Sequence, residues 1–257
     1  MLAWWKRRSE ARTLERRPIP DDLWRLTLAR FPFLARRSPD DLARLRTMAT
    51  LFLARKEFTG THGLVVTDSM AVAIAAQACL PVLELGLDGY DGFIGVVVHA
   101  DTVVAQRAFT DDDGVVHEYE EELSGEAMHG GPVMLSWHDV ADAGESAEDG
   151  YNVVIHEFVH VLDMRDGEAD GVPLLADRAA RDRWIEVIDA EFDAFCERID
   201  GGETATVLDP YGAESVEEFF AVASEVFFVL PQALRAEHPQ LYALFTDFFR
   251  QDPARSG

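Results

Sequence analysis

Two histidines and a glutamate stand close together in the stretch HEFVH at residues 156–160, inside a mostly apolar run. On an α-helix, residues four positions apart share one face, so His156 and His160 can reach the same metal ion. A catalytic zinc needs three protein ligands and one open position for water, and imidazole is a common ligand. The pattern is typical of zinc hydrolases, in which Glu157 would take the proton of the attacking water.

The third ligand is not part of this motif. Metzincins, in which a third histidine follows closely, carry glycine and histidine at the positions that Asp163 and Asp166 occupy here. Asp163 lacks the backbone freedom with which glycine turns the chain back. Asp166 stays open as an oxygen ligand, and the alternative is a glutamate from a later helix, the gluzincin arrangement.

A later segment, residues 214–228, supplies such glutamates within a mostly apolar sequence. Glu218 and Glu225 lie two turns apart on one face of the expected helix. Carboxylates in an apolar helix need partners, and a metal or its histidines would serve. Spacing alone does not choose between Glu217, Glu218 and Glu225.

Helix signals predict the elements that precede the motif. One helix is expected to run from residue 20 toward residue 32, and a second to begin after the N-cap Ser38. A third is expected to be capped by Asp68 and to end at Pro81. It is apolar on all sides, so it should be buried.

Short β-rich runs separated by glycine and aspartate predict a small sheet between residues 82 and 137. These runs are VLEL, FIGVVVHA, TVVAQRAF, VVHEYEEEL and PVMLSW. We expect PVMLSW, residues 132–137, to form a sheet edge beside the metal, where an extended substrate can bind through its backbone. A turn region over 139–150 then leads to the motif helix, with Asn152 as its N-cap.

Helical periodicity returns in the last third of the chain. A long helix is expected after Asp177, followed by a loop that contains residues 209–212, and then by helices over about 214–230 and 231–250. Together these patterns predict an α+β protein that is predominantly helical.

The charge is strongly asymmetric. The chain has a formal net charge of −24, yet residues 1–56 hold 14 Lys/Arg against 6 Asp/Glu, a balance of +8 that leaves −32 for the rest. The strong negative charge of residues 57–257 repels the phosphate backbone of nucleic acids, which argues against nucleic-acid binding. We find no apolar run long enough to span a membrane and no secretory signal, so we expect a cytoplasmic protein.

Several longer stretches resemble the Mlc titration factor A family of bacterial zinc-dependent peptidases, over about residues 18–253. They are LARKEF, AIAAQACLPVLELGLDGYDGF, GPVMLSW, NVVIHEFVHVLDM and EEFFAVASEVFF. Residues 211–221 are also similar to the protease domain of anthrax lethal factor, a more distant gluzincin relative. The resemblance implies a gluzincin-like zinc metallopeptidase fold with a small mixed β-sheet.

The resemblance also implies a set of site residues. One Zn²⁺ would be held by His156, His160 and Glu218. Glu157 would be the general base, and Tyr211, seven residues before Glu218, would be the phenol that helps to stabilise the oxyanion.

Two further acids, Asp163 and Glu225, become candidates for orienting the histidines, and the alternative for Asp163 is that it only closes the helix. For the domain organisation, we expect a basic, flexible head over residues 1–17, a helical portion over 18–66 and a catalytic portion over 67–257. The last two can form one continuous domain.

Two functions follow from the resemblance. The first is hydrolysis of peptide bonds in a peptide or protein substrate, with a regulatory role through a transcriptional repressor. The second is a non-catalytic regulatory protein that sequesters a transcription factor, such as a Mlc-like sugar-phosphotransfer repressor, with zinc mainly structural. The acidic body suits capture of a basic DNA-binding domain.

Overall fold

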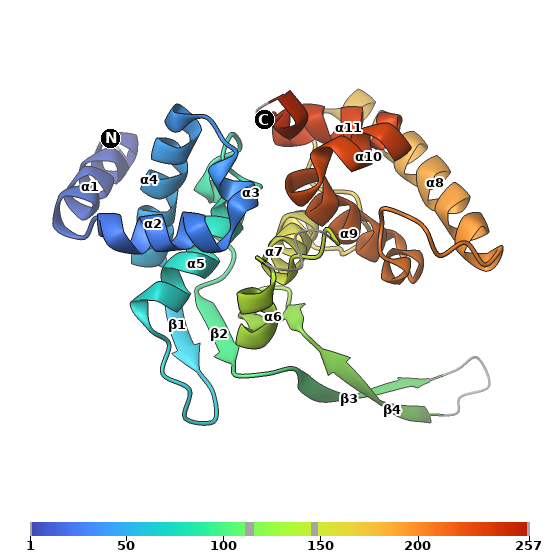
Figure 1. Cartoon of the computed structure of the whole chain (residues 1–257), viewed down its shortest axis with the longest axis horizontal. Coiled ribbons are helices and arrows are strands. Elements are labelled where there is room, and N and C mark those ends of the chain that lie inside the picture. Colours follow the sequence, from blue (N-terminus) through green and yellow to red (C-terminus); the bar gives the residue numbers. More distant parts are fainter. Residues whose placement is uncertain (1, 111–115, 145–148, 256–257) are drawn as a thin grey trace.

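The computed structural model describes residues 2–110, 116–144 and 149–255. Figure 1 shows an α+β arrangement in which the N-terminal helices and the C-terminal helices flank a central helix, with a small sheet beneath. The expectation of a predominantly helical α+β protein with a small mixed sheet is confirmed. No helix in the described ranges is long and apolar enough to cross a membrane.

The N-terminal helices begin at the predicted signals. Ser38 Oγ accepts a hydrogen bond from Asp41 N at 3.1 Å and so caps α4. The cap of α5 is Thr67, whose Oγ1 accepts from Met70 N, and the predicted cap Asp68 is instead the first helical residue. The helices of this part are α1 (Leu2–Arg16), α2 (Asp21–Arg30), α3 (Pro32–Ala35), α4 (Pro39–Arg55) and α5 (Asp68–Cys79).

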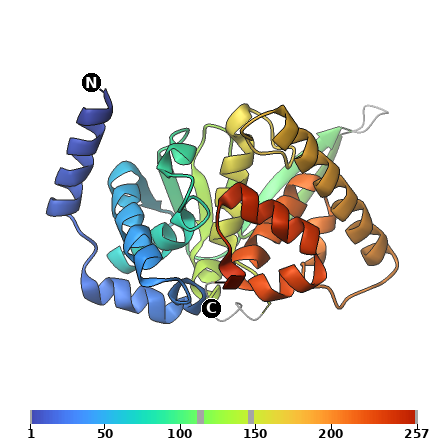
Figure 2. The same ribbon diagram turned by 90° about the horizontal axis from the view of Figure 1, so that it is seen from above.

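Helix α5 is buried along its length and packs against both α2 and α4, so contacts cross the boundary expected near residue 66. The basic head, expected to be flexible, contains helix α1. That helix contacts α4, and Arg55 Nη2 lies 2.6 Å from Glu10 Oε1. Figure 2 shows α1 at the outer edge of the molecule.

The main sheet has four strands in the order β1 (Glu57–Gly60), β2 (Gly95–His99), β6 (Val133–Ser136) and β5 (Gly125–Ala127). The first three strands are parallel, and β5 is antiparallel to β6. A separate antiparallel pair, β3 (Val103–Thr110) and β4 (Val116–Leu123), projects from the body in Figure 1.

The sheet corrects two expectations and contains two strands that were not predicted. Residues 82–85 form no strand: the backbone turns there after Pro81, with Leu85 N and Gly86 N both donating to Val82 O. PVMLSW supplies β6, which is an interior strand because β5 pairs with its outer side. The edge strands β1 and β5 were not predicted, since runs of four and three residues carry too little alternation to be recognised.

The C-terminal part is again helical. The expected helix over 231–250 is two helices, because Pro239 has no N–H to donate and pushes His238 out of the helical region, to φ −125° and ψ 65°. The predicted turn region over 139–150, of which residues 145–148 lie outside the described ranges, contains the end of a short helix, α6 (Trp137–Asp142). The elements are α6 (Trp137–Asp142), α7 (Val153–Asp163), α8 (Arg178–Asp200), α9 (Val216–Val229), α10 (Pro231–Glu237) and α11 (Pro239–Phe249), with single 3₁₀ turns η1 (Leu87–Tyr90), η3 (Met164–Asp166), η4 (Pro210–Ala213) and η5 (Pro253–Arg255).

Helix α7 is the centre of the core and contacts α5, β5, β6 and α9. The ring of Phe158 lies 5.6 Å from Phe52, 5.0 Å from Tyr90 and 5.8 Å from Phe93, all of them buried. Truncating a buried phenylalanine to alanine costs about 3–5 kcal/mol. This packing fixes the rotation of α7 and therefore the direction in which its histidines point.

Candidate metal centre

The start of α7 is held by a polar network inside the core. Asn152 Oδ1 accepts from Ile155 N at 2.9 Å, which confirms the predicted cap. Asn152 Nδ2 donates to Gln77 Oε1 of α5 at 2.7 Å, and both side chains are fully buried. The N-terminus of the motif helix is thus tied to a second helix before the histidines are reached.

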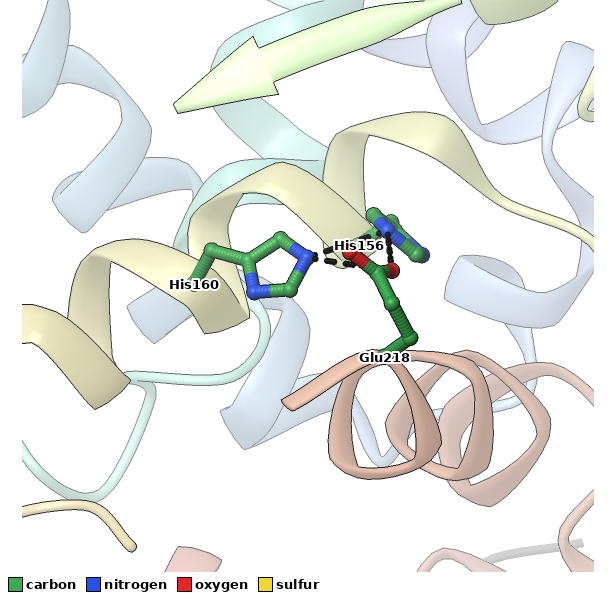
Figure 3. Close-up of side chains that lie close together, drawn as sticks. All are labelled: His156, His160 and Glu218. Carbon is green, nitrogen blue, oxygen red and sulfur yellow. Dashed lines mark hydrogen bonds and ion pairs between the residues drawn. The ribbon is translucent and has the colours of Figure 1, made fainter. Parts of the chain in front are cut away.

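Glu218 approaches from the opposite side, in the first turn of α9. Ser215 Oγ caps this helix by accepting from Glu218 N at 3.3 Å. Figure 3 shows the carboxylate of Glu218 between the imidazoles of His156 and His160 on α7. Two helices that are distant in the sequence therefore supply one cluster.

The three side chains direct one atom each toward a common point. His156 Nε2 lies 3.0 Å from Glu218 Oε2 and 3.1 Å from His160 Nε2, and His160 Nε2 lies 3.4 Å from the same oxygen. Donors about 2.0–2.1 Å from a tetrahedral zinc are separated by roughly 3.3–3.4 Å. In addition, Glu218 Oε2 is buried without a hydrogen bond of acceptable geometry. The residues fit a zinc ion.

The other acids that the sequence left open are not in this cluster. His156, His160 and Glu218 are the one group of three metal-ligating side chains found within the described part of the chain. Asp166 lies in η3 with its side chain exposed, and its Oδ1 accepts from Glu168 N.

Glu225 contacts the ring nitrogen of His156 that faces away from the cluster. Its Oε1 lies 2.8 Å from His156 Nδ1, and its Oε2 accepts from Asn152 N. A carboxylate accepts hydrogen bonds, so the ring proton belongs on Nδ1, and the lone pair of Nε2 points into the cluster. This is the orienting contact expected for Glu225.

Charges in the cluster shift several pKa values. Burial favours the neutral form of Glu218, but the two facing histidines outweigh it and hold its pKa below the usual range. Burial opposes the charged form of His156, but the carboxylates of Glu218 and Glu225, which face its two ring nitrogens, raise its pKa well above the ordinary value. Burial raises the pKa of Glu225 itself, with His156 opposing the shift.

Asp163 plays a different part from the one expected. It is fully buried, and its Oδ2 accepts from Gly171 N at 2.9 Å; no described histidine is its hydrogen-bond partner. Trp184 Nε1 donates to Gly171 O at 2.8 Å. Gly171 has φ +73°, and a β-carbon there would lie 2.8 Å from Val216 O at the start of α9. Asp163 thus joins the end of α7 to a loop packed against the helix that carries Glu218.

Glu157 lies against the edge of the sheet. Its side chain is 5% exposed, and a β-carbon on Gly125 of β5 would lie 2.5 Å from Glu157 Oε1. A side chain at this position would therefore displace the carboxylate of Glu157. Burial raises the pKa of Glu157, while the charges of His156 and His160 lower it. A raised pKa suits a carboxylate that must accept and return a proton.

Tyr211 borders the same space from η4. Its ring centroid lies 6.2 Å from that of His156, and 40% of the residue is exposed. Asp209 Oδ1 accepts from Tyr211 N at 2.8 Å and so fixes the turn that carries the ring. The structure therefore brings together all five residues that the resemblance singles out.

A cavity of about 590 Å³ adjoins the cluster and is lined by His156, Glu157 and Tyr211. Its acidic lining residues are Asp139, Asp149, Glu157, Asp209, Glu214 and Glu225, and no lysine or arginine of the described segments lines it. The site therefore presents negative potential to whatever enters it.

Sequence reasoning missed two glycines that shape the site. Gly125 admits the carboxylate of Glu157, and Gly171 admits the start of α9. The sequence around Gly125 shows only that a turn residue follows an acidic run. Which side chain approaches a glycine is visible only when the chain is folded.

Comparison with known proteins places the chain among metallopeptidases. It is 41% identical over 194 residues to Mlc titration factor A of Pectobacterium atrosepticum, covering 74% of this chain and 71% of that protein. It is 37% identical over 256 residues to Mlc titration factor A of Klebsiella pneumoniae, covering 98% and 93%. An uncharacterized protein of Synechocystis is 36% identical over 242 residues, covering 93% and 87%.

The family model described as glucose-regulated metallo-peptidase M90 matches residues 2–250, a range that contains every residue of the cluster and of its supporting contacts. The match extends over nearly the whole chain, as does the identity to the Klebsiella relative. The chain therefore belongs to the glucose-regulated metallo-peptidase M90 family.

Proposed function

We propose that this protein is a zinc-dependent metallopeptidase of the gluzincin type. The observation that carries the proposal is the convergence of His156 Nε2, His160 Nε2 and Glu218 Oε2 at spacings suited to one zinc ion, with Glu157 beside them. Membership of a metallopeptidase family supports the same reading. When bound, zinc would supply a Lewis acid and a water of lowered pKa.

Each protein group then has a defined task. Glu157, buried and of raised pKa, accepts the proton of the attacking water and returns it to the leaving amine. Tyr211, on its exposed turn, stabilises the developing oxyanion by a hydrogen bond from its phenol O–H. Glu225 keeps the proton of His156 on Nδ1, so that Nε2 stays available as a ligand.

The substrate is expected to bind along β5. This strand is the edge of the sheet that lies beside the cluster, because its first residue, Gly125, is next to the side chain of Glu157. An extended peptide can add to such an edge by backbone hydrogen bonds, which would place its carbonyl beside the cluster, within reach of the water that Glu157 deprotonates. The role first expected for residues 132–137 passes to β5, because β6 is already paired on both sides.

The test is a comparison of wild type with Glu157→Gln, measured as zinc content and as cleavage of a peptide library. Glutamine keeps the shape but cannot accept the proton, so we expect zinc to stay bound and kcat to fall at least a hundredfold. Glu217→Gln, a change on α9 outside the cluster, should leave both unchanged. Full activity of Glu157→Gln would refute the proposed mechanism.

A second candidate function is regulation by binding, supported by the relatives named Mlc titration factor A. In this alternative the protein sequesters a Mlc-like repressor in the cytoplasm, and zinc is mainly structural. Titration of a purified repressor with wild type, Glu157→Gln and metal-stripped protein separates the two. Equal binding by all three, together with absent peptide cleavage by wild type, would favour the regulatory function alone.

A further inference from the structure

A second cavity lies on the C-terminal side of the core, away from the cluster of histidines. It has a volume of about 450 Å³ and is enclosed by α8, α11, the end of α7 and the loop after η3. Figure 2 shows α8 and α11 side by side in this half of the molecule. The volume falls within the range of small-molecule sites.

The walls of this cavity are apolar. Its apolar lining includes the buried Leu162, Trp184 and Leu244, the partly buried Phe248, and Leu174, which is 55% exposed. The one polar atom of Trp184, Nε1, is already used, because it donates to Gly171 O. No serine, threonine, asparagine, glutamine or histidine of the described chain lines the cavity.

The polar groups of the cavity are three arginines and one aspartate. Arg183 pairs with Asp247 at 3.3 Å. The side chains of Arg165 and Arg250 are exposed and form no ion pair or hydrogen bond with any residue the structure describes. Two cations without an acidic partner therefore lie beside one apolar cavity, in a chain with 47 acidic and 23 basic residues.

We propose that this cavity binds an amphiphilic carboxylate, an unbranched aliphatic chain with one anionic head. The guanidinium groups of Arg165 and Arg250 would hold the carboxylate, because arginine presents paired donors that match its geometry. The leucine and aromatic walls would cover the chain. A peptide is the poorer occupant, since its amide groups would find no hydrogen-bonding side chains in the walls besides the charged ones.

Calorimetric titration of the full-length protein with octanoate, decanoate and 1-octanol tests the proposal. Each methylene buried should tighten binding by about fourfold, so decanoate should bind about 16-fold more tightly than octanoate. Octanoate should in turn bind at least tenfold more tightly than 1-octanol, which lacks the charge. No heat of binding with decanoate up to 1 mM, or equal affinities for octanoate and octanol, would overturn it.

Variants locate the binding. The double change Arg165→Gln and Arg250→Gln should weaken octanoate at least tenfold while leaving 1-octanol unchanged. Ala180→Phe, which fills the cavity from α8, should abolish the binding of both. Arg178→Gln is the matched control for the arginine changes. Arg178 lies on α8, two residues before Ala180, with 94% of its side chain exposed, and it does not line the cavity. Circular dichroism of each variant verifies the fold.

Metal-stripped protein separates this site from the cluster at His156, where a carboxylate could bind zinc. Unchanged decanoate affinity after treatment with a chelator supports the proposal. Affinity that disappears with the metal, or that persists in Ala180→Phe, would place the ligand elsewhere and refute it. Binding of acetyl-dileucine in preference to decanoate would instead identify the occupant as a peptide C-terminus.

Discussion

Replacing Glu225 by glutamine should weaken metal binding, although Glu225 is not one of the proposed metal ligands. The carboxylate accepts two hydrogen bonds, one from His156 Nδ1 at 2.8 Å and one from Asn152 N. Glutamine has one oxygen for these two donors. Its amide group must therefore face either the ring nitrogen or the backbone N–H at the start of α7.

Both orientations are costly. If the amide group faces His156, the ring proton moves to Nε2, the atom needed for the metal. If it faces Asn152, a buried N–H loses its acceptor, which costs about 1–3 kcal/mol because Glu225 is only 3% exposed and water does not replace it. We expect zinc affinity to fall by about 10–100-fold, as is usual when a group that orients a ligand is lost.

The assay is competition for zinc with a chromophoric chelator, combined with urea unfolding of the metal-stripped protein. Glu217→Gln on the same helix is the control, and it should change neither quantity, since Glu217 is outside the metal-ligating group. Zinc affinity of Glu225→Gln within twofold of wild type would show that the contact with His156 does not hold the ring, and would refute the reasoning.

Three more predictions follow from the supporting contacts. Gly125→Ala puts a β-carbon 2.5 Å from Glu157 Oε1, so kcat/KM for peptide cleavage should fall at least tenfold while the zinc content stays unchanged. Gly92→Ala is the control and should change neither quantity, because nothing lies within 4 Å of a β-carbon there. Gly171→Ala adds an overlap with Val216 to the backbone strain of φ +73°, so the free energy of unfolding in urea should fall by about 2 kcal/mol or more. Gly202→Ala is the control: this residue has φ +82° but open space around it, so its free energy of unfolding should fall by only about 1 kcal/mol. Burial raises the pKa of Asp163 from 3.8 to about 7, so between these values the folded state holds a proton that the unfolded chain releases, and the free energy of unfolding should decrease as the pH rises from about 4 to 7. Asp163→Asn should remove this part of the pH dependence in urea unfolding experiments across the range. An unchanged pH dependence would contradict the raised pKa of Asp163.

Much of the local structure could be predicted from sequence because it depends on neighbours within a few residues. The caps Ser38 and Asn152 and the apolar faces of α4, α5 and α9 are of this kind. The short edge strands were not predictable in this way. Three residues of β5 have no pattern of their own, and they form a strand only because β6 offers a free edge to pair with.

The sequence by itself determined that His156 and His160 share a helix face with Glu157 beside them, since this follows from the 3.6-residue period. It did not determine which later acid meets them. Only the packing of α7 against α9 brings Glu218 to the front of the imidazoles and Glu225 to the back of His156. Helical spacing fixes which residues lie on one face, whereas the rotation and crossing of two helices are set by the side chains buried between them, and those contacts exist only in the folded chain.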